Sequence, residues 1–293
     1  MSTLNEVKEQ MVVVGSVGDF TNALQQIATI RMIKLREKVL RSRPFVEAAN
    51  EMLRELVSLR SSLDEETLMH LEGKHKKSTL MSTKRAVIII TSNAGLIGRY
   101  NIEIYQKVEK LLELEKDSDF YVIGKKGQEY YQAKRFKIHR YPYEVQENFT
   151  IKDLQRLINL FDYYSTITLV YSRYINSATR DVVTLSVVNP TPAEDPAHPL
   201  TDKEKKRLTH SFIYEPDIIE LIDGVSKKLR AALFQQQILD GRLSQFSAQM
   251  IGMKTASDNA NNLLADLRVD YNKQRRKLID KKISEVFAGS ALW

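Results

Sequence analysis

Apolar and small residues recur at alternating spacings of three and four positions through the C-terminal part of the chain. A strict 3.5-residue period is typical of a helix that supercoils around a partner helix. No proline follows Pro216, so this helix can run from Asp217 to Ala288. At 1.5 Å per residue it would be roughly 100 Å long, which predicts that it projects beyond any domain the rest of the chain can build. The stripe consists of Leu229, Ala232, Gln236, Leu239, Leu243, Phe246, Met250, Met253, Ser257, Ala260, Leu264, Leu267 and Tyr271.

The N-terminal part of the chain is the candidate partner helix. Apolar residues recur at helical spacing from Phe20 onward, and Asp19 or Thr21 could cap the start of the helix. We expect Pro44 to kink or end this helix, which then resumes at Phe45. The two stripes are expected to meet in an antiparallel coiled coil, with an ordinary helix bundle as the alternative. The N-terminal stripe consists of Leu24, Ala28, Met32, Leu35 and Val39, followed by Ala49, Leu53 and Leu56.

Between these helices, short β-branched runs alternate with helical stretches, which is typical of an α/β layer domain with a largely parallel sheet. The sequence therefore divides into an N-terminal coiled-coil helix (residues 1–60), a connector with the α/β domain (61–216) and a C-terminal coiled-coil helix (217–293). A loop is expected at Asn189–Ser211, which holds four of the seven prolines. Strands are expected at Arg85–Thr91, Phe120–Gly124, Thr166–Tyr171 and Val182–Val188, and helices at Ile102–Leu114, Lys125–Lys134 and Phe149–Tyr163.

The net charge of +7, from 44 basic and 37 acidic residues, is concentrated in two helical segments, Arg31–Arg43 and Arg268–Lys282. In an antiparallel pair we expect these clusters to lie near the same level and form a basic collar. Each run can also be an ordinary solvated helix face. Nucleic-acid binding would require aromatic side chains among the basic ones, and only Tyr271 qualifies. An acidic protein surface therefore fits the clusters better.

The sequence offers little catalytic chemistry. It contains no cysteine, which excludes disulfides, thiolate catalysis and cysteine-ligated metals. None of the five histidines has a second histidine or a carboxylate at metal-binding spacing. The turn Ser92–Asn101 follows a strand but lacks both phosphate-loop motifs, so its glycines are better suited to turning the backbone. We predict no catalytic residue, cofactor or metal site, and no membrane-spanning helix, because no run of 18 apolar residues occurs.

The segment Ser247–Leu292 resembles the signature of the gamma subunit of F-type rotary ATPases, M-x-x-A-[ST]-D-N-A…YN-x-x-R-Q…E-I-x-x-G-A. Shorter matches occur in chain order at SRPF (Ser42–Phe45), TSNAGLIGRYN (Thr91–Asn101), VYSRYINS (Val170–Ser177) and YEPD (Tyr214–Asp217). The resemblance therefore covers nearly the whole chain. The residues that match the C-terminal signature are Met253, Ala256, Ser257, Asp258, Asn259, Ala260, Tyr271, Asn272, Arg275, Glu285 and Gly289.

The resemblance implies a central shaft: an antiparallel coiled coil of the terminal helices with a Rossmann-like α/β domain at its foot. The shaft would stand in a ring of alpha and beta subunits that carry the catalytic sites, so the chain itself would not be an enzyme. An epsilon- or delta-like rotor subunit and a membrane rotor ring are further implied partners, with a peripheral location on the cytoplasmic face of a bacterial membrane. The collar facing the beta subunits would comprise Arg31, Lys34, Arg36, Lys38, Arg268, Lys273, Arg275, Arg276 and Lys277. The tip seated in the ring's bearing would comprise Val286, Phe287, Ala288, Leu292 and Trp293.

Departures from the family pattern leave alternatives. The first helix of the family begins with a basic stretch, whereas Gln10–Thr21 has lost that charge and gained two glycines. The family's D-R-G is Asn93–Gly95 here, and its glutamine after the conserved arginine is Arg276. These changes suggest, as an alternative to an ordinary synthase subunit, the shaft of a divergent motor that hydrolyses ATP for another task. A lesser alternative is a coiled-coil nucleic-acid-binding protein, whose affinity would fall steeply with salt.

Overall fold

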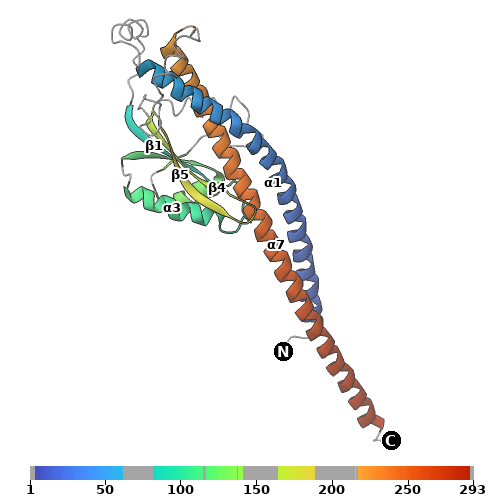
Figure 1. The fold of residues 1–293 in the computed structure, drawn as a ribbon. Coiled ribbons are helices and arrows are strands. Elements are labelled where there is room, and N and C mark those ends of the chain that lie inside the picture. Colours follow the sequence, from blue (N-terminus) through green and yellow to red (C-terminus); the bar gives the residue numbers. More distant parts are fainter. Residues whose placement is uncertain are drawn as a thin grey trace. The chain divides into compact units, whose positions relative to one another are not determined.

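The computed structural model describes residues 4–61, 82–114, 117–136, 138–140, 164–188, 215 and 217–290. In chain order, a long helix comes first and another comes last, and short strands and helices lie between them (Figure 1). The elements are α1 (Leu4–Ser61), β1 (Ser82–Ile90), α3 (Tyr100–Leu114), β2 (Ser118–Ile123), α4 (Lys125–Ala133), β3 (His139–Arg140), β4 (Tyr164–Tyr174), β5 (Arg180–Val188) and α7 (Ile218–Ser290). No helix among the described residues is both long and apolar enough to cross a membrane.

The chain forms two compact units, and α1 and α7 contribute to both. The first unit, which we call the rod unit, consists of Met1–Met32, Leu96–Gly98 and Phe246–Trp293. The second, which we call the α/β unit, consists of Ile33–Gly95 and Arg99–Gln245. Each unit has its own buried side chains and is described separately below.

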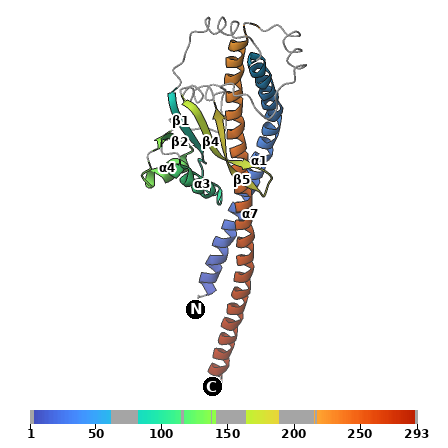
Figure 2. The same ribbon diagram turned by 60° about the vertical axis from the view of Figure 1, so that its left-hand side comes forward.

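In the rod unit, the N-terminal part of α1 and the C-terminal part of α7 lie side by side (Figures 1 and 2). The predicted stripe of α7 faces inward, since Met253, Ser257 and Ala260 are buried and the next three members are half-buried. The buried or half-buried stripe of α1 continues the same spacing toward the N-terminus through Val7, Met11, Val14, Gly18, Thr21, Gln25, Ala28 and Met32. This pattern confirms the predicted coiled coil.

The start of α1 differs from the prediction. The helix begins at Leu4, so neither Asp19 nor Thr21 caps it. The Thr21 hydroxyl instead donates hydrogen bonds to the carbonyl oxygens of Val17 (2.9 Å) and Gly18 (3.0 Å) within the helix. Gly15 and Gly18 obscured the stripe in the sequence because glycine lowers helix propensity. Gly18 nevertheless occupies a position of the seam.

Pro44 lies inside α1, so of the two predicted outcomes, a kink or an end of the helix, the end is excluded. A proline in a helix interior removes one backbone hydrogen bond and costs about 3 kcal/mol or more. Packing offsets that cost, because α1 on the far side of Pro44 shares an apolar core with the beginning of α7 in the α/β unit. This core contains Val46, Leu53, Leu56 and Leu59 of α1, and Ile218, Ile222 and Leu229 of α7.

The sheet of the α/β unit has five strands in the order β3-β2-β1-β4-β5. The first four run parallel, and β5 pairs antiparallel with β4 at the edge. The four predicted strands and the helices α3 and α4 are confirmed within a few residues, whereas β3 was not predicted. The predicted helix Phe149–Tyr163 and the loop Asn189–Ser211 lie outside the described residues. The fold is thus a Rossmann-like α/β layer combined with long terminal helices.

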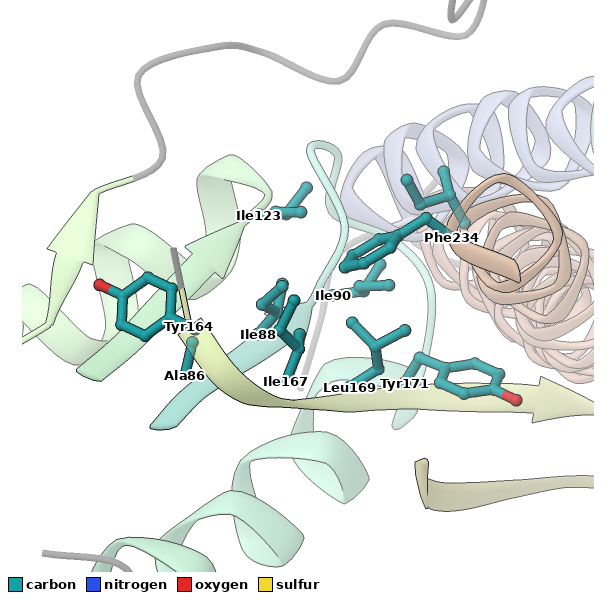
Figure 3. Close-up of a cluster of buried hydrophobic side chains, with 10 residues drawn as sticks. Ala86, Ile88, Ile90, Ile123, Tyr164, Ile167, Leu169, Tyr171 and Phe234 are labelled. Carbon is teal, nitrogen blue, oxygen red and sulfur yellow. The ribbon is translucent and has the colours of Figure 1, made fainter. Parts of the chain in front are cut away.

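One face of the sheet packs on α7. Successive side chains of a strand point to opposite faces, so Ala86, Ile88 and Ile90 of β1 share the face that meets Phe234 and Ile238 (Figure 3). The N-terminus of α7 is fixed by Asp217, whose Oδ1 accepts hydrogen bonds from the backbone amides of Ile219 and Glu220, both at 2.9 Å. This capping satisfies amides that have no partner inside the helix.

Candidate functional site

The register of the two helices in the rod unit is fixed by two contacts. A Cβ atom placed on Gly18 of α1 would lie 3.6 Å from the Cβ of Ala260 in α7. The guanidinium carbon of Arg31 lies 5.6 Å from the centre of the Phe246 ring, a cation–π contact. Residue numbers rise along α1 as they fall along α7, so the pair is antiparallel.

This register separates the two basic clusters, contrary to the prediction that they lie at one level. Arg31 is level with Phe246, and Arg268 lies 22 residues further along α7. At 1.5 Å per residue that separation is about 30 Å. Counting eight residues from the Gly18–Ala260 contact in both directions places Arg268 level with Gln10. Within the rod unit, Arg31 and the basic residues of α7 from Arg268 onward therefore lie at different levels.

All nine basic side chains assigned to the collar are exposed. The α1 group consists of Arg31, Lys34, Arg36 and Lys38, and the α7 group of Arg268, Lys273, Arg275, Arg276 and Lys277. Near the first group, Arg41 forms an exposed ion pair with Glu37 at 2.5 Å. Exposed ion pairs contribute little stability, so this pair adds little to the stability of α1.

The last turns of α7 extend past the start of α1. In the register above, Leu4 is level with Gln274, and from Arg275 to Ala288 every residue of α7 is exposed. Val286 and Phe287, two of the residues assigned to the tip, are 72% and 70% exposed. Ala288 is exposed as well, whereas Leu292 and Trp293 lie outside the described residues. The described end of α7 is thus a single helix with apolar side chains open to a partner.

The polar groups of the turn after β1 are used within the protein. The backbone amide of Lys125 donates to Asn93 Oδ1 (3.1 Å), and the Ser92 amide donates to Asn101 Oδ1 (3.2 Å). Gly124 has a φ of 113°, and a Cβ there would collide with the carbonyl oxygen of Thr91. These contacts join the turn to the start of α4, and they occupy the side-chain oxygens of Asn93 and Asn101 as hydrogen-bond acceptors. Among the described residues, no group of three or more histidine, aspartate or glutamate side chains could hold a metal ion.

A buried carboxylate in the α/β unit was missed in the sequence. Asp240 of α7 is only 6% exposed, and its Oδ1 has no hydrogen-bond partner among the described residues. Burial raises the pKa of this carboxyl to about 6, although the charges of Arg43 and Arg173 and a backbone hydrogen bond from Tyr174 act in the opposite direction. The sequence held one indication that Asp240 is buried, namely its position next to the stripe residue Leu239. A residue next to a seam position is buried where a second layer covers the helix.

Comparisons with known proteins agree over the whole chain. A family model described as ATP synthase matches residues 3–292. The ATP synthase gamma chain of Psychrobacter sp. (strain PRwf-1) is 30% identical, over 99% of each chain. The chain belongs to the ATP synthase gamma chain family. The gamma chain of Halothermothrix orenii is 24% identical, again over 99% of each chain.

Solved structures show the same fold. A chain of the Euglena gracilis mitochondrial ATP synthase, from a structure of OSCP, F1 and c-ring, matches with a TM-score of 0.64 and 16% identity over 98% of this chain and 93% of that one. A chain of the Tetrahymena thermophila central stalk and c-ring matches with a TM-score of 0.59 and 18% identity, over 81% and 99%. The comparisons do not favour the alternative of a motor with a different task.

The α1–α7 seam of the rod unit provides a direct test of the register. We expect Gly18→Ala to raise the free energy of unfolding by about 0.5–1 kcal/mol, because alanine is the better helix former. The new methyl group would also meet Ala260 at an ordinary contact distance. Urea denaturation followed by circular dichroism measures the change.

The matched control is Gly15→Ala, since a Cβ at Gly15 has no neighbour within 4 Å. The free energy of unfolding of this variant should rise only through the higher helix propensity of alanine. A loss of stability for Gly18→Ala together with a gain for Gly15→Ala would mean that the helix axes lie closer than this register has them.

Proposed function

We propose that this gamma chain is the central rotor shaft of an F-type ATP synthase, which couples ATP synthesis or hydrolysis on a ring of alpha and beta subunits to rotation. The observation that carries the proposal is the antiparallel α1–α7 seam, found in a chain that matches the family from residue 3 to residue 292. Two helices locked along a continuous seam resist bending and twisting better than one helix. A rod of this kind transmits torque through contacts at its surface.

The catalytic sites are proposed to lie on the partner beta subunits, so the chain is a non-catalytic subunit. The proposed location is peripheral, on the cytoplasmic face of a bacterial membrane. A further rotor subunit of the epsilon or delta type and a membrane rotor ring are the remaining proposed partners. In support, the matched chains from Euglena and Tetrahymena come from structures that include a c-ring.

We propose a separate role for each of the predicted domains. Residues 1–60 and 217–293 would supply the shaft, and residues 61–216 the foot that carries the α/β layer. We propose the exposed α1 and α7 basic groups as two separate contact regions for acidic surfaces of the beta subunits. The apolar end, with Val286, Phe287, Ala288, Leu292 and Trp293, is proposed as the tip held by the ring.

The contact region on α7 is tested with the double substitution Arg275→Ala and Arg276→Ala. We expect ATP hydrolysis by the purified complex to fall by about tenfold, which corresponds to about 1.4 kcal/mol. Both side chains are exposed, so the helix content and thermal midpoint of the gamma chain should not change. Steady-state hydrolysis by the complex, together with circular dichroism of the isolated chain, measures the two effects.

The control is Lys281→Ala with Lys282→Ala, which removes the same charge from an exposed stretch of the same helix. Its hydrolysis rate should stay close to that of the unmodified complex. The rotor assignment itself fails if the chain, purified from its own cells, is a solitary monomer with no ATPase subunits bound.

A further inference from the structure

An open pocket of about 530 Å³ lies in the α/β unit, next to the carboxyl end of β4. Small-molecule sites in proteins have volumes of roughly 300–1,000 Å³, so this pocket is large enough for one. One wall is a side of α3, and the other is the turn between β4 and β5 with the first residues of β5. All of the lining residues belong to the α/β unit.

An ion pair joins the two walls. Side chains of a strand alternate between faces, and Val183 and Leu185 of β5 pack on the core that contains Phe234. Arg180 therefore points to the opposite face, where α3 lies (Figure 2). Its Nε and Nη2 donate hydrogen bonds to Glu103 Oε2 (2.9 Å) and Oε1 (3.0 Å). This two-point contact holds β5 against α3.

The turn between β4 and β5 is also fixed by its own hydrogen bonds. The Asn176 side-chain oxygen accepts bonds from the backbone amides of Ala178 (2.9 Å) and Thr179 (2.7 Å). The backbone amide of Asn176 donates to the carbonyl oxygen of Thr179 (3.1 Å). Both walls are thus formed before any ligand arrives, and a preformed site loses less affinity to ordering.

Two lysines of α3 line the pocket without a counter-charge. Lys107 and Lys110 are exposed and three positions apart, so they lie on the same side of the helix. Neither forms an ion pair within the part of the chain that the structure describes. Glu103 stands one turn before Lys107, at a spacing that permits pairing. Both of its oxygens are instead bonded to Arg180.

The second acidic residue at the pocket does not balance these charges either. Asp181 follows Arg180 in β5, so its side chain points to the other face of the sheet. There it stands directly opposite Arg173 of β4. Glu103 neutralises one of the three cations that face the pocket, and two positive charges remain.

We propose that this pocket binds a small molecule through a phosphate or diphosphate group, held by Lys107, Lys110 and Arg180. An arginine has five N–H groups, so Arg180 keeps three beyond the two that Glu103 accepts. Lysine and arginine are the usual partners of phosphate oxygens. The proposal goes beyond the proposed function and does not depend on it, because the isolated chain contains the whole pocket.

The topology of the sheet favours a ligand at this place. In the order β3-β2-β1-β4-β5, the chain moves from β1 to β2 on one side, and β4 stands on the other side of β1. Open α/β sheets bind ligands outside the carboxyl ends of their strands, near such a reversal. The pocket lies at the carboxyl end of β4, beside the helix that follows β1.

Two other uses of the charges are weaker. Exposed lysines on a helix are ordinary, but here they border a concave site whose walls are joined by an ion pair. An acidic peptide could also neutralise them. The α3 wall extends only from Glu103 to Lys110, which is about 10 Å of helix. That length suits a small molecule better than an extended peptide.

The test is isothermal titration calorimetry of the purified full-length chain at low salt, with inorganic pyrophosphate and with ADP as probes. We expect both to bind, and the double substitution Lys107→Gln with Lys110→Gln to weaken both at least about tenfold. Both lysines are exposed, so the thermal midpoint should not change. The control, Lys281→Gln with Lys282→Gln, removes the same charge from exposed positions of α7 and should leave the affinity unchanged.

A second variant separates the pocket from surface charge. Ala178→Trp keeps the backbone amide that donates to Asn176 and leaves the charge unaltered, while its large side chain fills part of the pocket. We expect at least about a tenfold loss of pyrophosphate affinity. An unchanged affinity would show that the lysines act as open surface charges and would overturn the proposal.

Three further results would contradict the proposal: no binding of either probe, equal losses for the two lysine pairs, or hexaglutamate binding more tightly than pyrophosphate. If ADP binds more tightly than pyrophosphate, the nucleoside part also contacts the pocket; equal affinities mean that the diphosphate alone is recognised. Both of these outcomes support the phosphate site. Co-purification with ATPase subunits is a separate measurement, so the rotor assignment and the phosphate site can fail independently.

Discussion

Replacing Phe234 with alanine is expected to lower the free energy of unfolding of the α/β unit by about 3–5 kcal/mol. Phe234 is 1% exposed and projects from α7 into the cluster formed by Ile88, Ile90 and Leu169 (Figure 3). It is the largest side chain that α7 inserts there, so its removal leaves a cavity which the flanking strands cannot close without disturbing their pairing. Thermal or urea denaturation, followed by the circular dichroism signal, measures the loss.

The matched control is Phe45→Ala, in the α1 part of the same unit. Phe45 is 60% exposed, so the same truncation should change stability by no more than about 0.5 kcal/mol. Similar losses for the two variants would show that Phe234 does not hold α7 to the sheet. If the loss at Phe234 is large enough to prevent folding, Phe234→Leu gives a smaller, measurable decrease.

Replacing Asp240 with asparagine is expected to stabilise the chain by about 1–3 kcal/mol at pH 8. Burial raises the pKa of this carboxyl to about 6, from 3.8 in the unfolded chain. Between these two values the folded state binds more protons than the unfolded state, so stability falls as the pH rises. Above the folded-state pKa the carboxylate is ionised in the core, and the full penalty is present. The asparagine side chain carries no charge, so the stability of the variant should not fall in this way as the pH rises.

The measurement is the urea midpoint at pH 4 and at pH 8 for both proteins. We expect the two midpoints to converge at pH 4, where the folded-state carboxyl is protonated, and to separate at pH 8. A pH-independent difference would mean that the substitution acts through packing and not through ionisation. Asp181, an exposed aspartate in the same unit, supplies the control substitution to asparagine.

Periodicity predicted the parts of the fold that depend on one segment at a time. The α7 stripe and the four main strands follow from spacing and β-branched runs, because burial imposes a period on each element. The true start of α1 did not follow, since Gly15 and Gly18 lowered the helical signal over a segment whose seam was already in register. β3 has only two residues, too few to show any period.

The relation between segments was harder to predict. The charge clusters at Arg31 and Arg268 were predicted to lie at one level because the sequence predicts an antiparallel helix pair but does not specify its register. That register depends on the close approach of Gly18 and Ala260, a contact between two residues that are common in many settings. Likewise, the burial of Asp240 depends on what covers α7. The stripe predicted for α7 could not indicate this burial because it describes only the side of the helix that faces α1. Which basic residues contact a partner remains a prediction.

The single-helix end of α7 has a thermodynamic consequence. About fifteen residues beyond the level of Leu4 have no neighbouring helix among the described residues, and helices of that length are marginal in water when isolated. Their backbone amides should therefore exchange with solvent faster than those near Ala260. A partner that encloses this end must order it, and the entropy lost in ordering reduces the affinity that its apolar side chains provide.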